Sequence, residues 1–346
     1  MNPILVEATR GDAVESVHCG ALAILDADGS VVAFLGDIER PIFPRSAVKV
    51  LQALPLVASG AADRLGLTDD ELALACASHN GEEIHAQTAA RMLAKAGLDV
   101  DALECGAHWP YLDTATRALA AHGQTPTALN NNCSGKHAGF LCMACALHGG
   151  VDLRQYVRGY VGADHPVMRE VTAALQAATG YDLANTPRGT DGCSIPTYAV
   201  PLRHLAYAFA RVGTGIGLSD DHASAAKRLR AAVAKAPFMV AGTGRFDTRV
   251  MERLGERVFC KVGAEGVFCA ALPAFGLGVA IKIDDGNNAR AAEVVMAAVI
   301  ESLIAMDDDE ASFMRSLSEV QMTNWNGIEV GRLRASAALR SLHINA

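Results

Sequence analysis

The chain has 346 residues, of which 51% are hydrophobic and only 5% aromatic, and it carries a formal net charge of −8. Because the acidic residues are dispersed and few aromatic side chains are available for base stacking, the composition argues against nucleic-acid binding. No apolar run approaches membrane-spanning length, and residues 1–12 lack the basic start and apolar core of a signal peptide. Nine scattered cysteines favour reduced thiols and a cytoplasmic protein.

A β-hairpin is the first predicted element. Residues 21–25 and 31–35 are apolar and flank the turn residues Asp26-Ala27-Asp28-Gly29. A helix follows from Ser46, and residues from about 68 to 185 are mainly helical. Hydrophobic periodicity predicts its clearest helices over residues 82–97, 134–148 and 165–179. A further helical stretch is predicted over residues 202–236, and a helix over residues 288–305. Strands are predicted over residues 258–263, 266–272, 276–284 and 326–332.

The order of these elements predicts an α/β protein of the α+β type. Strands from both ends of the chain would form one antiparallel sheet flanked by helices. A large helical insertion of about residues 64–240 would separate the strands of 20–36 from those of 258–284. Because no repeat, low-complexity linker or clean boundary interrupts the sequence, we expect a single catalytic unit over residues 1–346, made of two intimate lobes.

The segment PRSAVK, residues 44–49, carries the strongest catalytic signal. It places Ser46 three residues before Lys49 at the start of an apolar helix, where side chains at i and i+3 share a face. A serine hydroxyl becomes a good nucleophile when a base takes its proton, and a lysine serves as that base when burial or nearby positive charge disfavours its charged form. The alternative is a capping serine beside a lysine that reaches solvent. The same spacing at Ser224 and Lys227, on a charged helix face, reads as a chance match.

Two polar segments precede predicted helices. CASHNG, residues 76–81, would deliver Ser78 and Asn80 from a short strand to the edge of a site; alternatively, these side chains cap the next helix. NNNCSGKHAG, residues 130–139, sets Lys136 and His137 before an almost wholly apolar helix. Backbone amides at that helix start would hold an anion, and the alternative is an elaborate helix cap.

Three further motifs are less decisive. The loop GTDGCS, residues 189–194, offers Asp191 for a substrate ammonium and Cys193 for a metal, or is an ordinary surface turn. Lys261 lies on a predicted strand, where a lysine considered by itself is expected to face solvent. Cys142 and Cys145 lie inside an apolar helix with no second pair at zinc-finger spacing, which favours buried core thiols.

Together, an early Ser-x-x-Lys at a helix start and a late Lys-x-Gly on a strand resemble the serine β-lactamase, penicillin-binding protein and glutaminase superfamily. Val262 replaces the Ser or Thr expected there, and no Ser-Asp-Asn motif is present, which argues against β-lactam chemistry. The ordered motifs PRSAVK, CASHNGE, CGAHWP, NNNCSGKHAGF, GTDGCSIP, AGTGRFD and KVGAEGVF are similar to the bacterial L-asparaginase II family, the rhizobial-type asparaginases. This resemblance covers nearly the whole chain and implies a serine β-lactamase-like fold.

The resemblance also implies two Ser-Lys pairs and a metal position. The pairs would be Ser46 with Lys49 and Ser78 with Lys261. The metal ligands would be Cys133, Lys136 and Cys193. Two thiolates and a nitrogen suit zinc, with water as the fourth ligand, and we expect the zinc to support the site rather than to be directly catalytic.

The predicted function is an L-asparagine amidohydrolase that forms aspartate and ammonia by a Ser-Lys nucleophilic mechanism. Such chemistry needs a nucleophile, a proton donor for the leaving ammonia and donors for an oxyanion. We assign Arg45 to the substrate carboxylate and Asp191 to its ammonium, with Asn80 and His137 as further polar contacts. The expected partners are the small-molecule substrate L-asparagine and a second copy in a homodimer, with no nucleic acid and no membrane.

Other functions stay open from the sequence. The nearest alternative is another serine acyl-transfer hydrolase: a glutaminase, a β-lactamase or a peptidase. An unrelated type of asparaginase uses a threonine nucleophile with a Thr-Asp pair. Thr190 and Asp191 could mimic that pair, but no matching N-terminal Thr-Gly-Gly motif is present. A non-catalytic amino-acid-binding sensor is the third alternative, and two Ser-Lys pairs argue against it.

Overall fold

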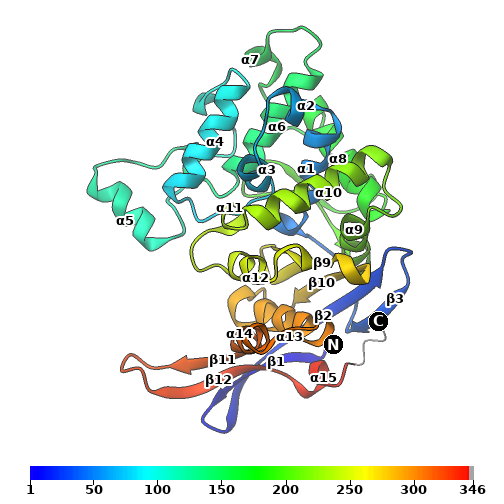
Figure 1. Ribbon diagram of the computed structural model, residues 1–346, viewed down its shortest axis with the longest axis vertical. Coiled ribbons are helices and arrows are strands. Elements are labelled where there is room, and N and C mark those ends of the chain that lie inside the picture. The colour runs from blue at the N-terminus through cyan, green and yellow to red at the C-terminus, as the bar shows by residue number, and fades with distance from the viewer. Residues whose placement is uncertain (343–346) are drawn as a thin grey trace. The chain divides into compact units, whose positions relative to one another are not determined.

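The computed structural model describes residues 1–342, which divide into two compact units. The first unit combines residues 1–47, residues 199–214 and the chain from residue 260 onward. The second unit comprises residues 48–198 and 215–259. The first unit therefore uses both ends of the chain and contains the large sheet, whereas the second unit is mainly helical (Figure 1).

An eight-stranded sheet is the framework of the first unit, with the strand order β11-β12-β1-β2-β10-β9-β8 and β3 paired to β2. Its strands are β1 (Ile4–Arg10), β2 (Ala13–Asp26), β3 (Val31–Leu35), β8 (Phe259–Val262), β9 (Val267–Leu272), β10 (Leu277–Ile283), β11 (Glu319–Thr323) and β12 (Glu329–Ala335). Strand β10 pairs antiparallel with both β2 and β9. All six residues of β9 are buried, as expected for a central strand that is covered on both faces.

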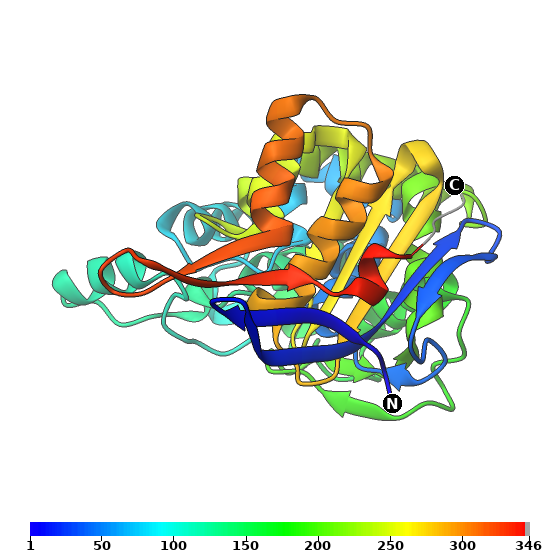
Figure 2. The same cartoon turned by 90° about the horizontal axis from the view of Figure 1, so that it is seen from below.

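Helices cover this sheet within the first unit. Helix α9 (Leu202–Thr214) packs on β2, β9 and β10, while α13 (Glu293–Leu303) contacts β1, β9 and β12. A short π-helix, η6 (Asn288–Ala292), leads into α13. Helices α13 and α14 (Asp308–Ser318) lie side by side (Figure 2). The remaining short elements are β4 (Pro41–Ile42), which pairs with β7 (Val200–Pro201), η5 (Pro273–Phe275) and α15 (Ala337–Arg340).

The second unit is built around α6 (Ser134–Leu147), which contacts α1, α3, α4 and α8. Helix α6 can be buried over most of its length because it is apolar almost all round. It approaches α3 closely, since a Cβ on Gly135 would lie 2.3 Å from Leu74 Cγ. The other elements are α1 (Lys49–Ala58), α2 (Ala61–Arg64), α3 (Asp69–Ala75), α4 (Glu83–Lys95), η2 (Val100–Ala102), α5 (Asp113–Ala121), η3 (Ala128–Asn130), α7 (Leu153–Tyr156), α8 (Pro166–Thr179), β5 (Arg188–Thr190), β6 (Pro196–Tyr198), α10 (Asp220–Lys235), α11 (Phe238–Ala241), α12 (Phe246–Leu254) and η4 (Gly255–Arg257).

The predicted fold class is confirmed: the protein is a mixed α/β structure with an antiparallel sheet from N- and C-terminal strands. The first hairpin, the three late strands and helices α4, α6 and α8 lie where the sequence predicted them. The helical stretch predicted over residues 202–236 is present as two helices, α9 and α10. Gly215 and Gly217 adopt positive φ angles, so α9 ends there, and Ser219 then caps α10.

Two strands of the large sheet, β1 and β11, were not predicted, nor were the short strands β4 to β7. The paired segment of β1 and β2 contains register shifts, and β1 buries residues in adjacent pairs rather than alternately, so it lacks the period of two that reveals a strand. The expectation of a single catalytic unit with two intimate lobes stays a prediction. No helix in residues 1–342 combines the length and the apolar character needed to cross a bilayer.

Replacing Gly278 by alanine should destabilise the first unit. Gly278 lies on β10, and a Cβ there would lie 2.0 Å from Ala206 O on α9, so the helix would have to move away from the sheet. We expect the free energy of unfolding to fall by about 1–3 kcal/mol in urea titrations.

The matched control is Gly213→Ala on the same α9. A Cβ at position 213 would make only ordinary contacts, of which the shortest are 3.4 Å to Ala271 Cβ and 3.6 Å to Pro273 Cα, so this variant should be neutral or more stable by about 0.5–1 kcal/mol. Equal stability of the Gly278→Ala variant and the wild type would show that α9 does not pack on β10 as described.

Candidate active site

The Ser-Lys spacing lies on one continuous helical segment. Ser46 belongs to the 3-10 helix η1 (Arg45–Val48), and Lys49 is the first residue of α1. Side chains at i and i+3 of a 3-10 helix are eclipsed. The predicted placement of Ser46 and Lys49 on one side of the helical segment is therefore retained. Arg45, directly before Ser46, has a φ of 51°, a left-handed conformation that is uncommon for a residue other than glycine and is frequent at functional sites.

The side chain of Lys49 is buried, with 1% of its surface exposed. Its Nζ donates a hydrogen bond to the carbonyl oxygen of Ala77 and lies 3.1 Å from Cys133 Sγ. A weaker contact of 3.5 Å joins it to Asn132 O. A buried amine needs such partners, and they hold Lys49 directly beside the backbone that precedes Ser78.

Ser78 lies on an irregular segment between α3 and α4. The amides of Ser78 and Asn80 donate to Val240 O at 2.8 Å and Ala241 O at 2.9 Å, so the segment pairs with the α11 backbone. The N-cap of α4 is Glu82, which rules out the alternative in which Ser78 or Asn80 caps this helix. Ser78 Oγ is buried without a hydrogen-bond partner among residues 1–342. Such a group carries a desolvation penalty, which a bound ligand could relieve.

Hydrogen bonds of the His79 side chain connect this segment to the start of α6. Its Nδ1 accepts a hydrogen bond from Gly81 N–H at 3.0 Å. Its Nε2 therefore carries the proton and donates to Ser134 Oγ at 3.0 Å. The ring stacks on His85 with centroids 4.7 Å apart, and His85 stacks on Phe238. This stack was not predicted, because its only sign in the sequence is a pair of histidines six residues apart.

Two cysteines and two lysines form a buried cluster, which we call the thiol–lysine cluster: Lys49, Cys133, Lys136 and Cys193. Lys136 Nζ lies 3.0 Å from Cys193 Sγ, and the two thiols are hydrogen-bonded to each other. The hydrogen bond from Cys193 and the charges of Lys49 and Lys136 outweigh burial and lower the pKa of Cys133 well below its usual range. The same thiol–thiol bond and burial raise the pKa of Cys193. The two thiols therefore titrate as an interacting pair in which the anionic form is favoured at Cys133 and disfavoured at Cys193.

The three residues implied as zinc ligands converge in this cluster. Burial lowers the pKa of Lys136, but the two sulfurs outweigh burial and raise it. Lys136 would have to lose its proton to coordinate zinc, and the charge of the metal would favour that loss. Two sulfur donors and one nitrogen in mutual contact fit zinc. Within residues 1–342, no group of three or more His, Cys, Asp or Glu side chains could hold a metal, so lysine would be the third ligand of such a site.

His137, a predicted substrate contact, is fully buried behind Lys136. Tyr160 Oη accepts a hydrogen bond from Glu104 N–H at 3.1 Å and lies 2.6 Å from His137 Nδ1. We assign the tyrosine proton to this second contact, which leaves the histidine proton on Nε2, a buried atom without a partner among the described residues. Burial and the charges of Lys136 and Lys49 lower the pKa of His137 well below its usual value, so it is neutral.

Asp191 and Cys193 share one turn between β5 and β6. Asp191 N–H donates to Ile195 O, and Asp191 O accepts from Ser194 N–H. Ser194 takes a φ of 75° in this turn. The motif is therefore a specific hairpin connection that carries a carboxylate and a thiol on neighbouring positions, rather than an ordinary surface turn.

Lys261 belongs to the first unit, as do Arg45 and Ser46. The expectation that Lys261 faces solvent is wrong, since it is fully buried on β8 and its Nζ donates to Val262 O at 2.8 Å. It can be buried because β8 belongs to the large sheet. The pairing of Ser78 with Lys261 stays a prediction from the family resemblance. Cys142 is buried as expected of a core thiol, and Cys145 is partly exposed.

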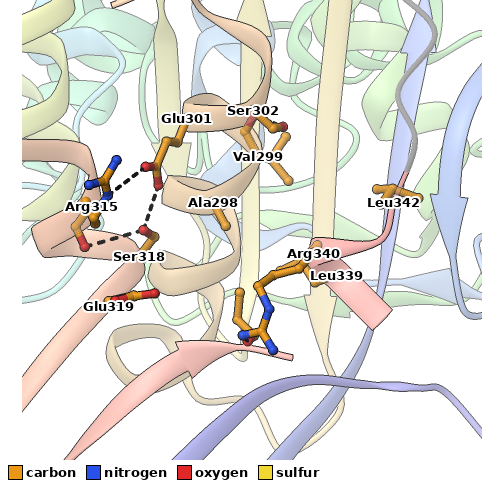
Figure 3. A pocket seen from close by; sticks show the side chains of 11 residues that line it. Ala298, Val299, Glu301, Ser302, Arg315, Ser318, Glu319, Leu339, Arg340 and Leu342 are labelled. Carbon is orange, nitrogen blue, oxygen red and sulfur yellow. Dashed lines mark hydrogen bonds and ion pairs between the residues drawn. The ribbon is translucent and has the colours of Figure 1, made fainter. Parts of the chain in front are cut away.

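A cavity of about 360 Å³ lies within the first unit, between α13, α14 and α15 (Figure 3). Glu301 accepts a hydrogen bond from Ser318 Oγ at 2.8 Å and lies 3.5 Å from Arg315 Nε. These polar groups satisfy one another, and none of the predicted site residues is among those that line the cavity. We therefore assign it no catalytic role.

Buried lysines beside serine and cysteine side chains are typical of enzymes that activate a nucleophile. The chain belongs to the L-asparaginase II family, whose sequence model matches residues 6–335. The predicted family is thus confirmed, and membership supports an amidohydrolase of the asparaginase type that acts on a small molecule. Comparison with curated proteins gives no significant match.

Similar solved structures include a β-lactamase from Mycobacterium bovis, with 14% identity over 82% of this chain and 94% of that chain and a TM-score of 0.41. A protein named Mglu, in its native form, is similar with 16% identity over 84% of this chain and 66% of that chain and a TM-score of 0.37. This chain therefore spans about two thirds of the length of Mglu.

Tyr160→Phe should destabilise the protein by about 1–3 kcal/mol, because it leaves both Glu104 N–H and His137 Nδ1 without their partner. Thermal or urea unfolding measures this change. Tyr156→Phe is the control, since Tyr156 is partly exposed and contacts His165 through its ring, and we expect a change below about 0.5 kcal/mol. Equal effects of the two substitutions would contradict the described network.

Proposed function

We propose that the protein is an L-asparaginase that hydrolyses L-asparagine to aspartate and ammonia by a Ser-Lys nucleophilic mechanism. The observation that carries the proposal is the environment of Lys49. This side chain is buried, follows Ser46 by three residues on one helical segment, and reaches the carbonyl of Ala77 and the sulfur of Cys133. The unpartnered hydroxyl of Ser78 gives further support.

In this mechanism Ser46 Oγ attacks the side-chain amide carbon of asparagine while Lys49, in its neutral form, takes the hydroxyl proton. The tetrahedral intermediate collapses when the amide nitrogen receives a proton and leaves as ammonia. Water then attacks the resulting ester and restores Ser46, with aspartate as the product. Ser78 and Lys261 would relay protons or support the oxyanion.

The predicted contacts with the substrate belong to the same proposal. Arg45 would bind the carboxylate, and Asp191 would bind the ammonium. His137 presents a neutral ring whose Nε2–H lacks a partner among the described residues. Asn80 already donates to Thr243 O and accepts from Arg245, which favours an orienting role for this side chain.

Zinc at Cys133, Lys136 and Cys193 is a further part of the proposal. When bound, zinc would supply positive charge beside the site and a fourth position for water.

Nine free cysteines support a cytoplasmic location. The homodimer stays a prediction.

The substrate proposal is tested with two assays run in parallel. The first measures ammonia release from asparagine and from glutamine, and the second measures hydrolysis of a nitrocefin-type β-lactam. We expect asparagine to be preferred over glutamine by about 10- to 200-fold in kcat/KM, because a pocket fitted to a short side chain resists an added methylene. Comparable turnover of the two amides would contradict the specificity, and β-lactam hydrolysis without ammonia release would favour the alternative class.

Ser46→Ala should lower kcat by roughly 10³-fold or more, since it removes the nucleophile. Ser224→Ala is the matched control, because Ser224 has the same spacing to Lys227 on the solvated helix α10, and its activity should be unchanged. Trapping of an acyl-enzyme, followed by mass spectrometry, locates the reacting serine. Near-normal kcat in the Ser46→Ala variant would transfer the nucleophile role to Ser78.

Metal analysis of the purified protein should find zinc at about one atom per chain. Because we expect a supporting role, chelation should raise KM more than it lowers kcat, and Cys133→Ser with Cys193→Ser should do the same. Absence of zinc together with an unchanged KM in the double variant would make the thiols structural. Loss of kcat at saturating substrate would instead make the metal catalytic.

A further inference from the structure

The loop between α11 and α12 is closely fitted to the segment that carries Ser78 and Asn80. Glu82 Oε1 accepts a hydrogen bond from Thr243 N–H at 2.8 Å, and Glu82 Oε2 accepts from Thr243 Oγ1 at 2.7 Å. Asn80 Nδ2 donates to Thr243 O at 3.1 Å. Gly242 has a φ of 101°, and a Cβ there would lie 2.3 Å from Glu82 Oε1. The loop is therefore fixed at several points, and it ends at Arg245.

Arg245 has a half-buried guanidinium without a carboxylate partner. Its Nη1 donates to Asn80 Oδ1 at 3.1 Å, and residues 1–342 provide no ion pair to it. Two other arginines of this unit do have carboxylate partners: Arg154 pairs with Asp99 at 2.9 Å and Arg228 with Asp63 at 2.6 Å. A guanidinium offers five N–H donors, so Arg245 is oriented by one hydrogen bond while its charge and its other donors stay available.

Arg245 is held on the same face of the chain segment as the candidate site residue Ser78. The amides of Ser78 and Asn80 both point to the backbone of residues 240–241, as alternate residues of an extended segment do, so their side chains share one face. On that face Ser78 Oγ is unpartnered and Asn80 holds Arg245.

Tyr111 links Arg245 to the other charges of the site. Its backbone N–H donates to Asn80 O at 2.8 Å. Burial and the negative charge of Cys133 raise the pKa of its hydroxyl, Arg245 lowers it and Asp191 raises it. The cation of Arg245 and the carboxylate of Asp191 therefore both act on the Tyr111 hydroxyl, from different parts of the chain.

We propose that Arg245 is a substrate-binding residue that holds the α-carboxylate of the amino acid, with Asn80 orienting its guanidinium. The proposal rests on the proposed function for the identity of the ligand, and it adds a cationic contact to the one assigned to Arg45. A planar fork of donors matches a carboxylate in a bidentate arrangement. Asp191 would bind the α-ammonium, so the two charged groups of a zwitterion would meet opposite charges.

The test compares two ligands that differ only at the α-carboxylate. L-aspartate carries that carboxylate, and L-isoasparagine replaces it by a neutral amide of the same shape. Dissociation constants are measured by calorimetry for the full chain and for Arg245→Met, Arg245→Lys and the control Arg249→Met, which lies on the exposed side of the same helix α12. Thermal unfolding confirms that each variant folds.

The wild type should bind L-aspartate about 10- to 100-fold more tightly than L-isoasparagine, the range of a charge-assisted pair. Arg245→Met should reduce this preference to within about 3-fold, Arg245→Lys should keep part of it, and Arg249→Met should keep all of it. An unchanged preference in Arg245→Met would overturn the proposal, as would a wild type without preference between the two ligands.

Ammonia release from L-asparagine separates this inference from the proposed function. A wild type that shows the Arg245-dependent preference but releases no ammonia would refute the asparaginase proposal and leave the carboxylate contact standing. A wild type that releases ammonia while Arg245→Met keeps both the KM for asparagine and the ligand preference would refute the contact and leave the activity standing.

Discussion

The burial of two lysine side chains, Lys49 and Lys136, is the constraint on which the candidate site depends. An amine removed from water is unfavourable unless hydrogen bonds and opposite charge replace its hydration. The protein meets this requirement with sulfur: Lys49 contacts Cys133 at 3.1 Å and Lys136 contacts Cys193 at 3.0 Å. The charges of the two lysines in turn help to lower the pKa of Cys133, and a zinc ion that accepts both sulfurs would also favour their anionic forms.

Closely packed helices of the second unit surround the thiol–lysine cluster and bury it. Helix α6 carries Lys136 and His137, and it packs so closely on α3 that Gly135 leaves no space for a Cβ. His79, pinned by Gly81 and Ser134, joins the loop of Ser78 to the first turn of α6. Nucleophile activation requires side chains held in fixed geometry, and here the positions of the loop residues follow from hydrogen bonds to buried helices rather than from the loop itself.

Two loops that are distant in the sequence cooperate through Asn80, Glu82 and Thr243. Their hydrogen bonds give Arg245 a defined position without a carboxylate partner among residues 1–342, whereas Arg154, for example, pairs with Asp99. An amino-acid substrate brings a carboxylate and an ammonium, and a site that offers a guanidinium and Asp191 matches both charges. This complementarity would select zwitterionic substrates independently of the chemistry at the side-chain amide.

The sequence by itself determined the local features. Helical periodicity located α4, α6 and α8, apolar runs located β9 and β10, and the spacing of Ser46 and Lys49 followed from one helical turn. The sequence did not predict the break between α9 and α10, because the conformation of a glycine depends on its neighbours. Nor did it predict strands β1 and β11, because strand pairing depends on residues far away in the sequence. Only the tertiary structure decided that Lys49 meets Cys133, 84 positions away, and that Arg245 meets Asn80, 165 positions away. Such contacts leave no period in the sequence, because the packing of distant buried segments creates them. The same packing places Cys133 beside Cys193 and the lysines, and this environment lowers the pKa of Cys133.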